Sequence, residues 1–356
     1  MLVFMRELQQ SSVIRYEAKL LIVGEGGVGK SSLLRALQGE VFEAQLNTTH
    51  GIDVEQVKLH FPELPEKGIK LDTWDFGGQQ IYHATHQFFY TKRSIYMVVW
   101  SARLGAEHGR LHYWLENIRV LAPGVPVILV TTHIDERAPD LNYSQYKNAY
   151  PQIVMNLSIS NKTGDGIANL KATLARMAMQ LPLMGQPWPR TWVDAEQALF
   201  ARSEQYIDAE EYIACCTTHG VEADIAYGTL GDYLHDLGKI HYFHDDPLLQ
   251  NLVILHPNWI NKAISSVLDD ETTANKNGIL HISELPRIWS AYDPHLYSAF
   301  LRLMERFDLC YPLEADLPGT STTSILIPQL LPYQPPFELP IWSRRPKKGE
   351  EQVEMA

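Results

Sequence analysis

One stretch near the start of the chain constrains its fold more than any other: Gly24-Glu25-Gly26-Gly27-Val28-Gly29-Lys30-Ser31. Its spacing is G-x-x-x-x-G-K-S, with an apolar run before it at residues 19–23 and a helix-compatible run after it at 32–37. Strand, glycine-rich loop and helix in this order are the context of a phosphate-binding loop. We therefore expect an α/β nucleotide-binding domain; the alternative is a glycine-rich turn without a ligand.

The residue types of this stretch suit a polyphosphate. Glycines let successive backbone N–H groups face the phosphates, and the start of the helix adds the positive end of its dipole. Lys30 is expected to reach the β- and γ-phosphates, and the Ser31 hydroxyl to bind Mg²⁺. The predicted phosphate-binding residues are Gly26, Gly27, Val28, Gly29, Lys30, Ser31 and Ser32.

Up to about residue 182, apolar runs alternate with helical patterns, which predicts a doubly wound, mostly parallel sheet of the P-loop NTPase type. The runs at 94–100 and 125–130 are continuously apolar, as is typical of central strands covered on both faces. The runs at 57–61 and 69–71 are expected to form a hairpin that adds one antiparallel edge strand. Ligands of such folds bind at the carboxyl ends of the strands.

A Pro/Gly-rich break at residues 183–189 predicts a domain boundary. Helical patterns and short apolar runs after it predict a mainly helical α+β domain with a winged-helix-like part. The expected units are an N-terminal extension (1–15), the α/β domain (16–182), a linker (183–190), the second domain (191–333) and a tail (334–356). The tail is Pro-rich and then charged, so we expect it to be disordered.

Charge is unevenly spread along the chain. Residues 1–182 carry 18 Lys and Arg against 17 Asp and Glu, whereas the remainder carries 12 against 25. The acidic second half argues against nucleic acid or an anionic membrane as its partner, despite the winged-helix-like pattern, and favours a packing module. Three cysteines, no signal peptide pattern and no apolar run of about 18 residues favour a cytoplasmic protein without a membrane span.

Two further segments provide candidates for catalysis and metal binding. In Asp75-Phe76-Gly77-Gly78-Gln79, we expect Asp75 to hold Mg²⁺, Gly78 to offer its N–H to the γ-phosphate, and Gln79 to orient the attacking water. The alternative is an acidic turn after a strand. Thr49 lies where a loop can close over the γ-phosphate and is the candidate second protein ligand of Mg²⁺, although Thr48 is adjacent to it.

Base recognition is expected from two later loops. The Asp135 carboxylate can accept both N–H groups on the Watson–Crick edge of guanine, a donor pair that adenine lacks. His133 is a candidate for stacking on the base, and the alternative for Asp135 is a helix N-cap. The backbone around Ser160, Asn161 and Lys162 is expected to meet the guanine O6, although these residues alone also suit any polar turn.

The order G-x-x-x-x-G-K-S, T-x-G-I, D-x-G-G-Q, T-H-x-D, S-N-K resembles the Ras-like GTPase superfamily. Thr49-His50-Gly51-Ile52-Asp53, Trp74-Asp75-Phe76-Gly77-Gly78-Gln79 and Val130-Thr131-Thr132-His133-Ile134-Asp135 look like the Roc domain of Roco proteins, a family that includes the leucine-rich-repeat kinases. Residues 237–243 and 253–260 look like the first half of the COR domain that follows Roc. The resemblance covers residues 16–333 and implies GTP or GDP with Mg²⁺ as ligands and an intramolecular Roc–COR contact.

Two departures from the family pattern qualify this resemblance. Ras-like proteins usually have N-K-x-D for base recognition, whereas Thr132 and His133 occupy the Asn and Lys positions here, as is common in Roco proteins. The second half of COR, through which the family dimerises, is expected to be absent from this chain.

These features predict a GTPase switch that hydrolyses GTP to GDP and phosphate, with its switch loops coupled to COR. We expect slow hydrolysis, because no Arg occurs between Gln79 and Arg93 to stabilise the transition-state charge. The alternatives are an interaction scaffold that binds nucleotide with negligible turnover, and a P-loop ATPase or kinase, which would leave Asp135 without a role.

Overall fold

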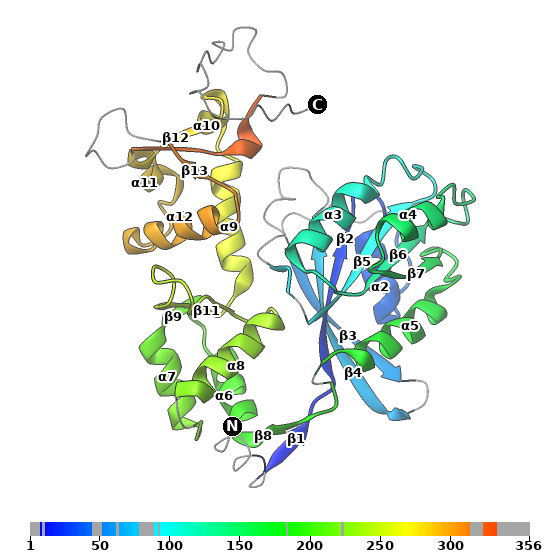
Figure 1. Ribbon diagram of the computed structural model, residues 1–356, viewed down its shortest axis with the longest axis horizontal. Coiled ribbons are helices and arrows are strands. Elements are labelled where there is room, and N and C mark those ends of the chain that lie inside the picture. The colour runs from blue at the N-terminus through cyan, green and yellow to red at the C-terminus, as the bar shows by residue number, and fades with distance from the viewer. Residues whose placement is uncertain are drawn as a thin grey trace, which may run out of the picture.

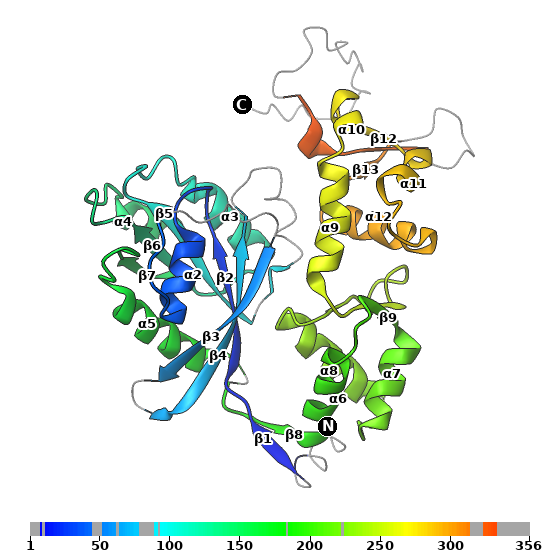
Figure 2. The same cartoon turned by 180° about the vertical axis from the view of Figure 1, so that it is seen from behind.

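The computed structural model describes residues 8, 11–44, 52–61, 64–77, 89–91, 93–182, 184–221, 224–313 and 323–332. Within them, an α/β domain and a mainly helical domain lie side by side (Figures 1 and 2). In the described part of the chain, no helix is both long enough and apolar enough to span a membrane.

The α/β domain is built on a six-stranded sheet in the order β3-β4-β2-β5-β6-β7. All neighbouring strands run parallel except β3 and β4, which pair antiparallel, so the predicted sheet and its edge hairpin are confirmed. The strands are β2 (Glu17–Val23), β3 (Ile52–Phe61), β4 (Leu64–Phe76), β5 (Ser94–Ser101), β6 (Val127–Thr132) and β7 (Ile153–Ser158). The helices are α2 (Lys30–Gln38), α3 (Leu111–Leu121), α4 (Tyr143–Ala149) and α5 (Ile167–Gln180).

Alternating residues of the central strands pack into two separate hydrophobic cores, one on each face of the sheet. Leu20 and Ile22 of β2 pack with α2 and α5 on one face of the sheet. Leu21 and Val23 face the other way and join a cluster that includes α3. Because side chains alternate along a strand, these continuously apolar runs can fill both faces at once.

The helical domain begins with a winged-helix-like unit, as predicted. Its elements are α6 (Arg190–Phe200), β9 (Tyr206–Asp208), α7 (Ala209–Thr218), α8 (Asp224–Asp236), β10 (His241–Tyr242) and β11 (Leu252–Ile254). The three strands form one sheet in the order β10-β11-β9. Asp208 caps α7 through a capping box with Glu211.

A second unit of short helices and strands follows. Its elements are α9 (Pro257–Leu268), α10 (Glu271–Asn275), β12 (Ile279–His281), η3 (Ile282–Glu284), α11 (Leu285–Ile288), η4 (Pro294–Leu296), α12 (Tyr297–Arg306), β13 (Tyr311–Pro312), β14 (Ser324–Leu326) and η5 (Pro328–Leu330). The strands form a small sheet in the order β12-β14-β13.

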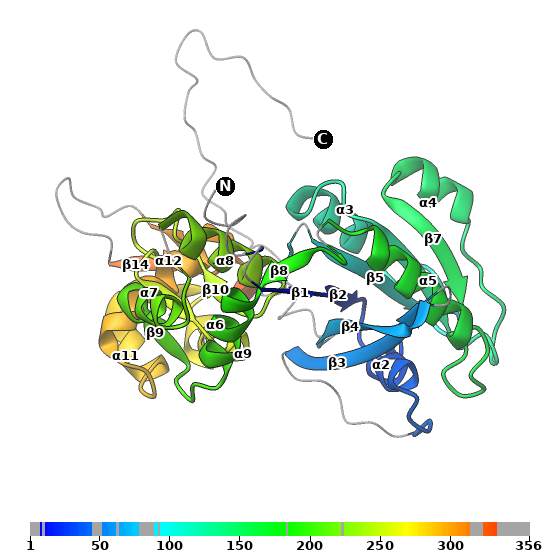
Figure 3. The same ribbon diagram turned by 90° about the horizontal axis from the view of Figure 1, so that it is seen from below.

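Residues assigned to the N-terminal extension and to the linker pair with each other. β1 (Ser12–Ile14) and β8 (Pro187–Pro189) form a two-stranded antiparallel sheet, which lies at the lower edge of the molecule in Figure 1 and between the two domains in Figure 3. The Pro-Trp-Pro sequence of β8 gives no strand signal by itself, because proline cannot donate to a ladder. The pair ties the start of the α/β domain to the start of the helical domain.

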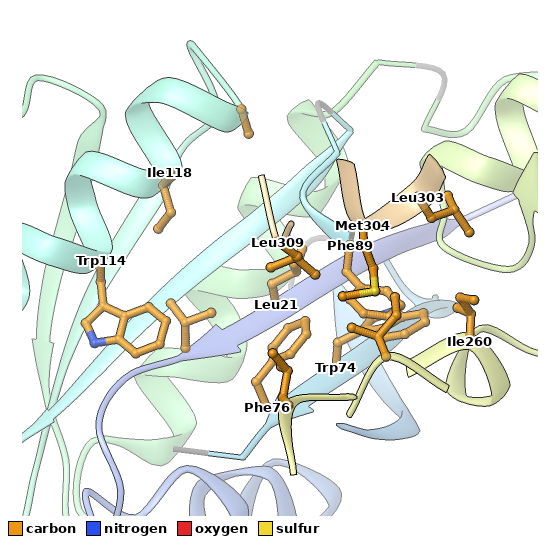
Figure 4. Close-up of a cluster of buried hydrophobic side chains, with 14 of the residues drawn as sticks. Leu21, Trp74, Phe76, Phe89, Trp114, Ile118, Ile260, Leu303, Met304 and Leu309 are labelled. Atoms are coloured by element: carbon orange, nitrogen blue, oxygen red, sulfur yellow. The ribbon is translucent and has the colours of Figure 1, made fainter. Parts of the chain in front are cut away.

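The two domains share one hydrophobic cluster. Leu21, Trp74 and Phe89 of the α/β domain belong to the same buried cluster as Ile260 and Met304 of the helical domain (Figure 4). The helical domain therefore covers the sheet face that also carries α3.

Four charged side chains, of which Glu196 is buried and the others are partly buried, reinforce this junction. Lys239 Nζ lies 2.7 Å from Glu17 Oε2 and 2.6 Å from Glu196 Oε1. Arg15 pairs with both carboxylates, at 2.9 Å from Glu17 Oε2. Burial by itself would raise the pKa of Glu17, but Lys239 and Arg15 together lower it. The pairs join β2 to α6 and to the end of α8.

Candidate nucleotide-binding site

The glycine-rich loop runs from the end of β2 into α2 and requires glycine at two positions. A Cβ on Gly24, at φ +145°, would lie 2.2 Å from the Val99 carbonyl oxygen. Gly29, at φ +91°, is the N-cap of α2, and a Cβ there would lie 3.2 Å from Asn161 Nδ2. The loop therefore fits closely against β5 and the loop after β7.

Lys30 lies inside the loop, with 6% of its surface exposed. Its Nζ donates hydrogen bonds to the carbonyl oxygens of Gly24, at 2.8 Å, and Glu25, at 2.9 Å. Burial lowers the pKa of Lys30 to about 8, although Asp75 and Glu25 oppose the shift. The amine is thus held by the backbone of the same loop that would surround a phosphate.

Two of the three predicted metal ligands, Ser31 and Asp75, lie within hydrogen-bond distance of each other. The Ser31 hydroxyl donates a hydrogen bond of 2.6 Å to Asp75 Oδ2, and Asp75, on β4, is 1% exposed. A hydroxyl and a buried carboxylate at a phosphate loop form a hard oxygen donor set that suits Mg²⁺. The third predicted ligand, Thr49, lies outside the described residues, as do Gly78 and Gln79.

Asp135 and Ser160 also meet. The Ser160 hydroxyl donates a 2.6 Å hydrogen bond to Asp135 Oδ1, and this bond lowers the pKa of the Asp135 carboxyl. An ionised carboxylate accepts hydrogen bonds only, as recognition of the two guanine N–H donors requires. Asp135 is exposed at the cavity wall, and no helix starts there, so the N-cap alternative does not hold.

The residues in the Asn and Lys positions of the base-recognition motif tie that motif to the phosphate loop. The Thr132 hydroxyl donates to the Val28 carbonyl oxygen at 2.7 Å. His133 Nδ1 lies 2.9 Å from Thr132 Oγ1 and 3.1 Å from Ser101 Oγ. Burial lowers the pKa of His133, which keeps the ring neutral at pH 7. Its position is therefore set by two hydroxyls, one of which holds the phosphate loop.

These parts enclose a cavity of about 420 Å³ at the carboxyl ends of the parallel strands. Predicted residues that line it are Gly26, Gly27, Gly29, Lys30, Ser31, Ser32, His133, Asp135, Asn161 and Lys162. Val28, Asp75 and Ser160 are not among the lining residues, but Asp75 holds Ser31 and Ser160 holds Asp135, while the Val28 carbonyl accepts a hydrogen bond from Thr132.

The cavity also has lining residues that the motifs did not reveal: Phe42, Glu43, Ala44, Phe76, Arg103 and Glu136. Phe42 exposes 39% of its surface, an unusual exposure for phenylalanine. Arg103 pairs with Glu136, the residue after Asp135, at 3.3 Å. A single aromatic residue after a helix and a single ion pair do not form a recognisable sequence motif. These lining residues can therefore be identified only from the structure.

Comparison with known families matches both domains. The family described as "Ras of Complex, Roc, domain of DAPkinase" matches residues 19–135. The family described as "C-terminal of Roc, COR-A domain" matches residues 189–331.

Relatives match most of the chain. A probable serine/threonine-protein kinase, pats1, of Dictyostelium discoideum is 31% identical over 96% of this chain. A Roc-COR-CHAT protease of Runella zeae is 25% identical over 87% of it. The chain spans only 12% of the first relative's length and 36% of the second's.

A solved structure, Methanosarcina barkeri Roco2 RocCORdC bound to GDP, is 33% identical to this chain. It matches with a TM-score of 0.80 and covers 90% of this chain and 98% of its own. Fold, order of domains and sequence thus agree over nearly the whole of both chains. The chain belongs to the Roco family, with a Ras-like Roc GTPase domain followed by a COR-A domain.

Proposed function

We propose that this protein is a guanine-nucleotide switch that slowly hydrolyses GTP to GDP and phosphate. The observation that carries the proposal is the convergence of three parts on one cavity: the Lys30 loop, the Ser31–Asp75 pair and the Asp135–Ser160 pair. The related Roco2 structure is described as GDP-bound, which supports a guanine nucleotide here.

Each part has a role in the proposed reaction. Lys30 and the loop N–H groups hold the β- and γ-phosphates, while Ser31 and Asp75, with Thr49, would hold Mg²⁺, which supplies charge neutralisation at the phosphates. Gln79 orients a water molecule for attack on the γ-phosphorus. The bond from that phosphorus to the β–γ bridging oxygen breaks, and the electron pair leaves with GDP.

The proposed role of Gln79 predicts a separation of rate from affinity. Gln79→Ala should lower the rate of GTP hydrolysis and leave GTP affinity nearly intact, because Gln79 acts on the water and not on the bound phosphates. Single-turnover kinetics and calorimetry measure the two quantities. An unchanged rate would move the catalytic role to another residue of the same loop.

The base-recognition site predicts a change of nucleotide preference. Asp135→Asn should weaken GDP binding by about 1–3 kcal/mol, the discrimination expected of one bidentate contact. Because asparagine offers one donor and one acceptor, the variant should gain affinity for xanthosine diphosphate, which has a carbonyl where guanine has its amino group. Competition against a fluorescent GDP analogue measures both effects, and Asp165→Asn provides a control on an exposed acid of the loop that carries Ser160.

The same competition assay tests the guanine assignment itself. GDP should displace the fluorescent analogue from native protein at far lower concentrations than ADP does. Equal displacement by ADP would favour the P-loop ATPase alternative and leave Asp135 without a role.

A further inference from the structure

A buried amine lies at the Roc–COR junction, away from the nucleotide cavity. Lys19, on β2, is 0% exposed, and its Nζ donates a 2.6 Å hydrogen bond to the Phe89 carbonyl oxygen. The Nζ also lies 5.0 Å from the centre of the Trp74 ring. Among the described residues, no carboxylate lies within ion-pair distance of it. Such a group is costly to bury, so its retention calls for a physical reason.

The carbonyl that Lys19 holds belongs to the chain just after the loop that carries Gly77 and Gln79. The stretch 78–88 lies outside the described residues, and Phe89 is where the described chain resumes. The Phe89 ring packs 4.8 Å from Trp74 and 5.7 Å from Phe76, between centroids. Phe76 directly precedes Gly77, so the described residues on either side of the stretch 77–88 pack in one cluster.

The COR-A domain holds the same segment from the other side. The Thr91 hydroxyl donates a 2.7 Å hydrogen bond to the carbonyl oxygen of Asp236, which is the last residue of α8. Arg93 forms an ion pair with the Asp236 carboxylate at 3.3 Å. The ring of His241, on β10, lies 5.1 Å from the Phe89 ring. Phe89, Thr91 and Arg93 are therefore held between Roc and COR-A.

COR-A also closes over Lys19 itself. Gly238, at φ +71° just beyond α8, lies so close that a Cβ there would be 2.8 Å from Lys19 Nζ and 2.8 Å from Trp74 Cζ2. His241 is 1% exposed, and neither of its ring nitrogens has a hydrogen-bond partner among the described residues. The position of α8 and β10 thus determines how much room the Lys19 amine and the Phe89 backbone have.

We propose that Lys19 is a positioning residue for GTP hydrolysis, which holds the Phe89 carbonyl against COR-A and so fixes the end of the loop that carries Gln79. This inference rests on the proposed GTPase function. In it, COR-A influences the rate of GTP hydrolysis through the contact between Lys19 and the Phe89 carbonyl. Lys19 touches neither nucleotide nor water in this account; it acts through Phe89.

The charges around Lys19 make its contribution depend on pH. Burial lowers its pKa to about 7, opposed by Asp236 at the end of α8 and Asp72 on β4. Burial also lowers the pKa of His235 on α8 to about 4 and that of His241 well below its usual value, so both face Lys19 as neutral rings. A charged amine holds a carbonyl more strongly than a neutral one, so hydrolysis should fall as the pH rises through about 7.

Stability should change in the opposite direction. The pKa of Lys19 is lower in the folded chain than in the unfolded chain, so the unfolded chain binds more protons between about pH 7 and the usual lysine value of about 10.4. The contribution of Lys19 to folding stability therefore rises with pH across that window. If Lys19 served only folding stability, the rate of GTP hydrolysis would not fall over the pH range in which that stability rises.

The test compares native protein with Lys19→Met and with Lys58→Met, which makes the same change on the exposed side of β3. Lys19→Met should leave GDP and GTP affinity within about twofold and lower single-turnover hydrolysis at pH 6.5 on the order of tenfold or more, as misplaced catalytic geometry does. It should also remove the fall in rate near pH 7. Lys58→Met should behave like native protein. Thr91→Val, which removes the bond to Asp236, should lower the rate in the same way without changing nucleotide affinity.

Native rates and an unchanged pH profile in Lys19→Met would overturn the inference, as would a parallel loss of nucleotide affinity, which indicates a purely structural role. If native protein binds GTP but does not hydrolyse it, no rate can be compared. The amide hydrogen-exchange rates of residues 89–94 then test the Lys19 contact separately from the GTPase proposal. Exchange about tenfold faster in Lys19→Met than in native and Lys58→Met protein would support the positioning contact while the GTPase proposal fails. Equal exchange in all three would refute the contact as well.

Discussion

Lys30→Met should lose GDP affinity on the order of 10²–10⁴-fold, the largest effect expected of any single change in the nucleotide cavity. The reason is the loss of charge-assisted hydrogen bonds to the phosphates, each worth about 1.5–3 kcal/mol. The fold should survive, because the variant replaces a buried amine whose partners are two carbonyl groups of its own loop.

Isothermal titration with GDP measures this loss, with Lys262→Met, on the exposed side of α9, as the matched control. Circular dichroism on both variants separates a binding defect from unfolding. Affinity of Lys30→Met within a few fold of native protein would contradict the assignment of the phosphate site.

Lys239→Met should lower the free energy of unfolding by about 3–5 kcal/mol, because it leaves the largely buried Glu17 and Glu196 carboxylates with Arg15 as their main partner, and only the exposed Lys70 beside Glu17. The effect should be smaller in acid. The pKa of Glu17 is lowered in the folded protein, so its ion pairs stabilise the fold above the usual glutamate pKa, and this contribution disappears as the pH falls through the folded-state value.

Urea unfolding at pH 7 and pH 4 measures both quantities. A second variant, Glu196→Gln, combined with Lys239→Met should cost less than the sum of the two single changes, since the partners are in contact. Additive costs, or a loss below 1 kcal/mol for Lys239→Met, would show that the cluster does not hold the junction together.

The local parts of this structure could be predicted from the sequence. The phosphate loop and the sheet follow from short patterns whose physical causes act within a few residues. Asp135 could be proposed as a base ligand because its position after an apolar strand placed it at the carboxyl edge of the sheet.

The junction could not be predicted in the same way. Lys239 and Glu17 are 222 residues apart, and nothing near either residue in the sequence indicates its partner. Lys19 lies in an apolar strand, where its side chain gave no sign of holding the Phe89 carbonyl. Such contacts depend on how two domains pack, and packing has no short sequence signature.

Phosphate release during a single turnover tests the central claim most directly. GTP is loaded onto native protein at one equivalent, Mg²⁺ starts the reaction, and free phosphate is followed to completion, in parallel with ATP. We expect slow release approaching one phosphate per bound GTP, and none from ATP. A protein that retains intact GTP throughout would be a nucleotide-binding scaffold, and equal release from ATP would contradict guanine selection; either result would contradict the proposed GTPase switch.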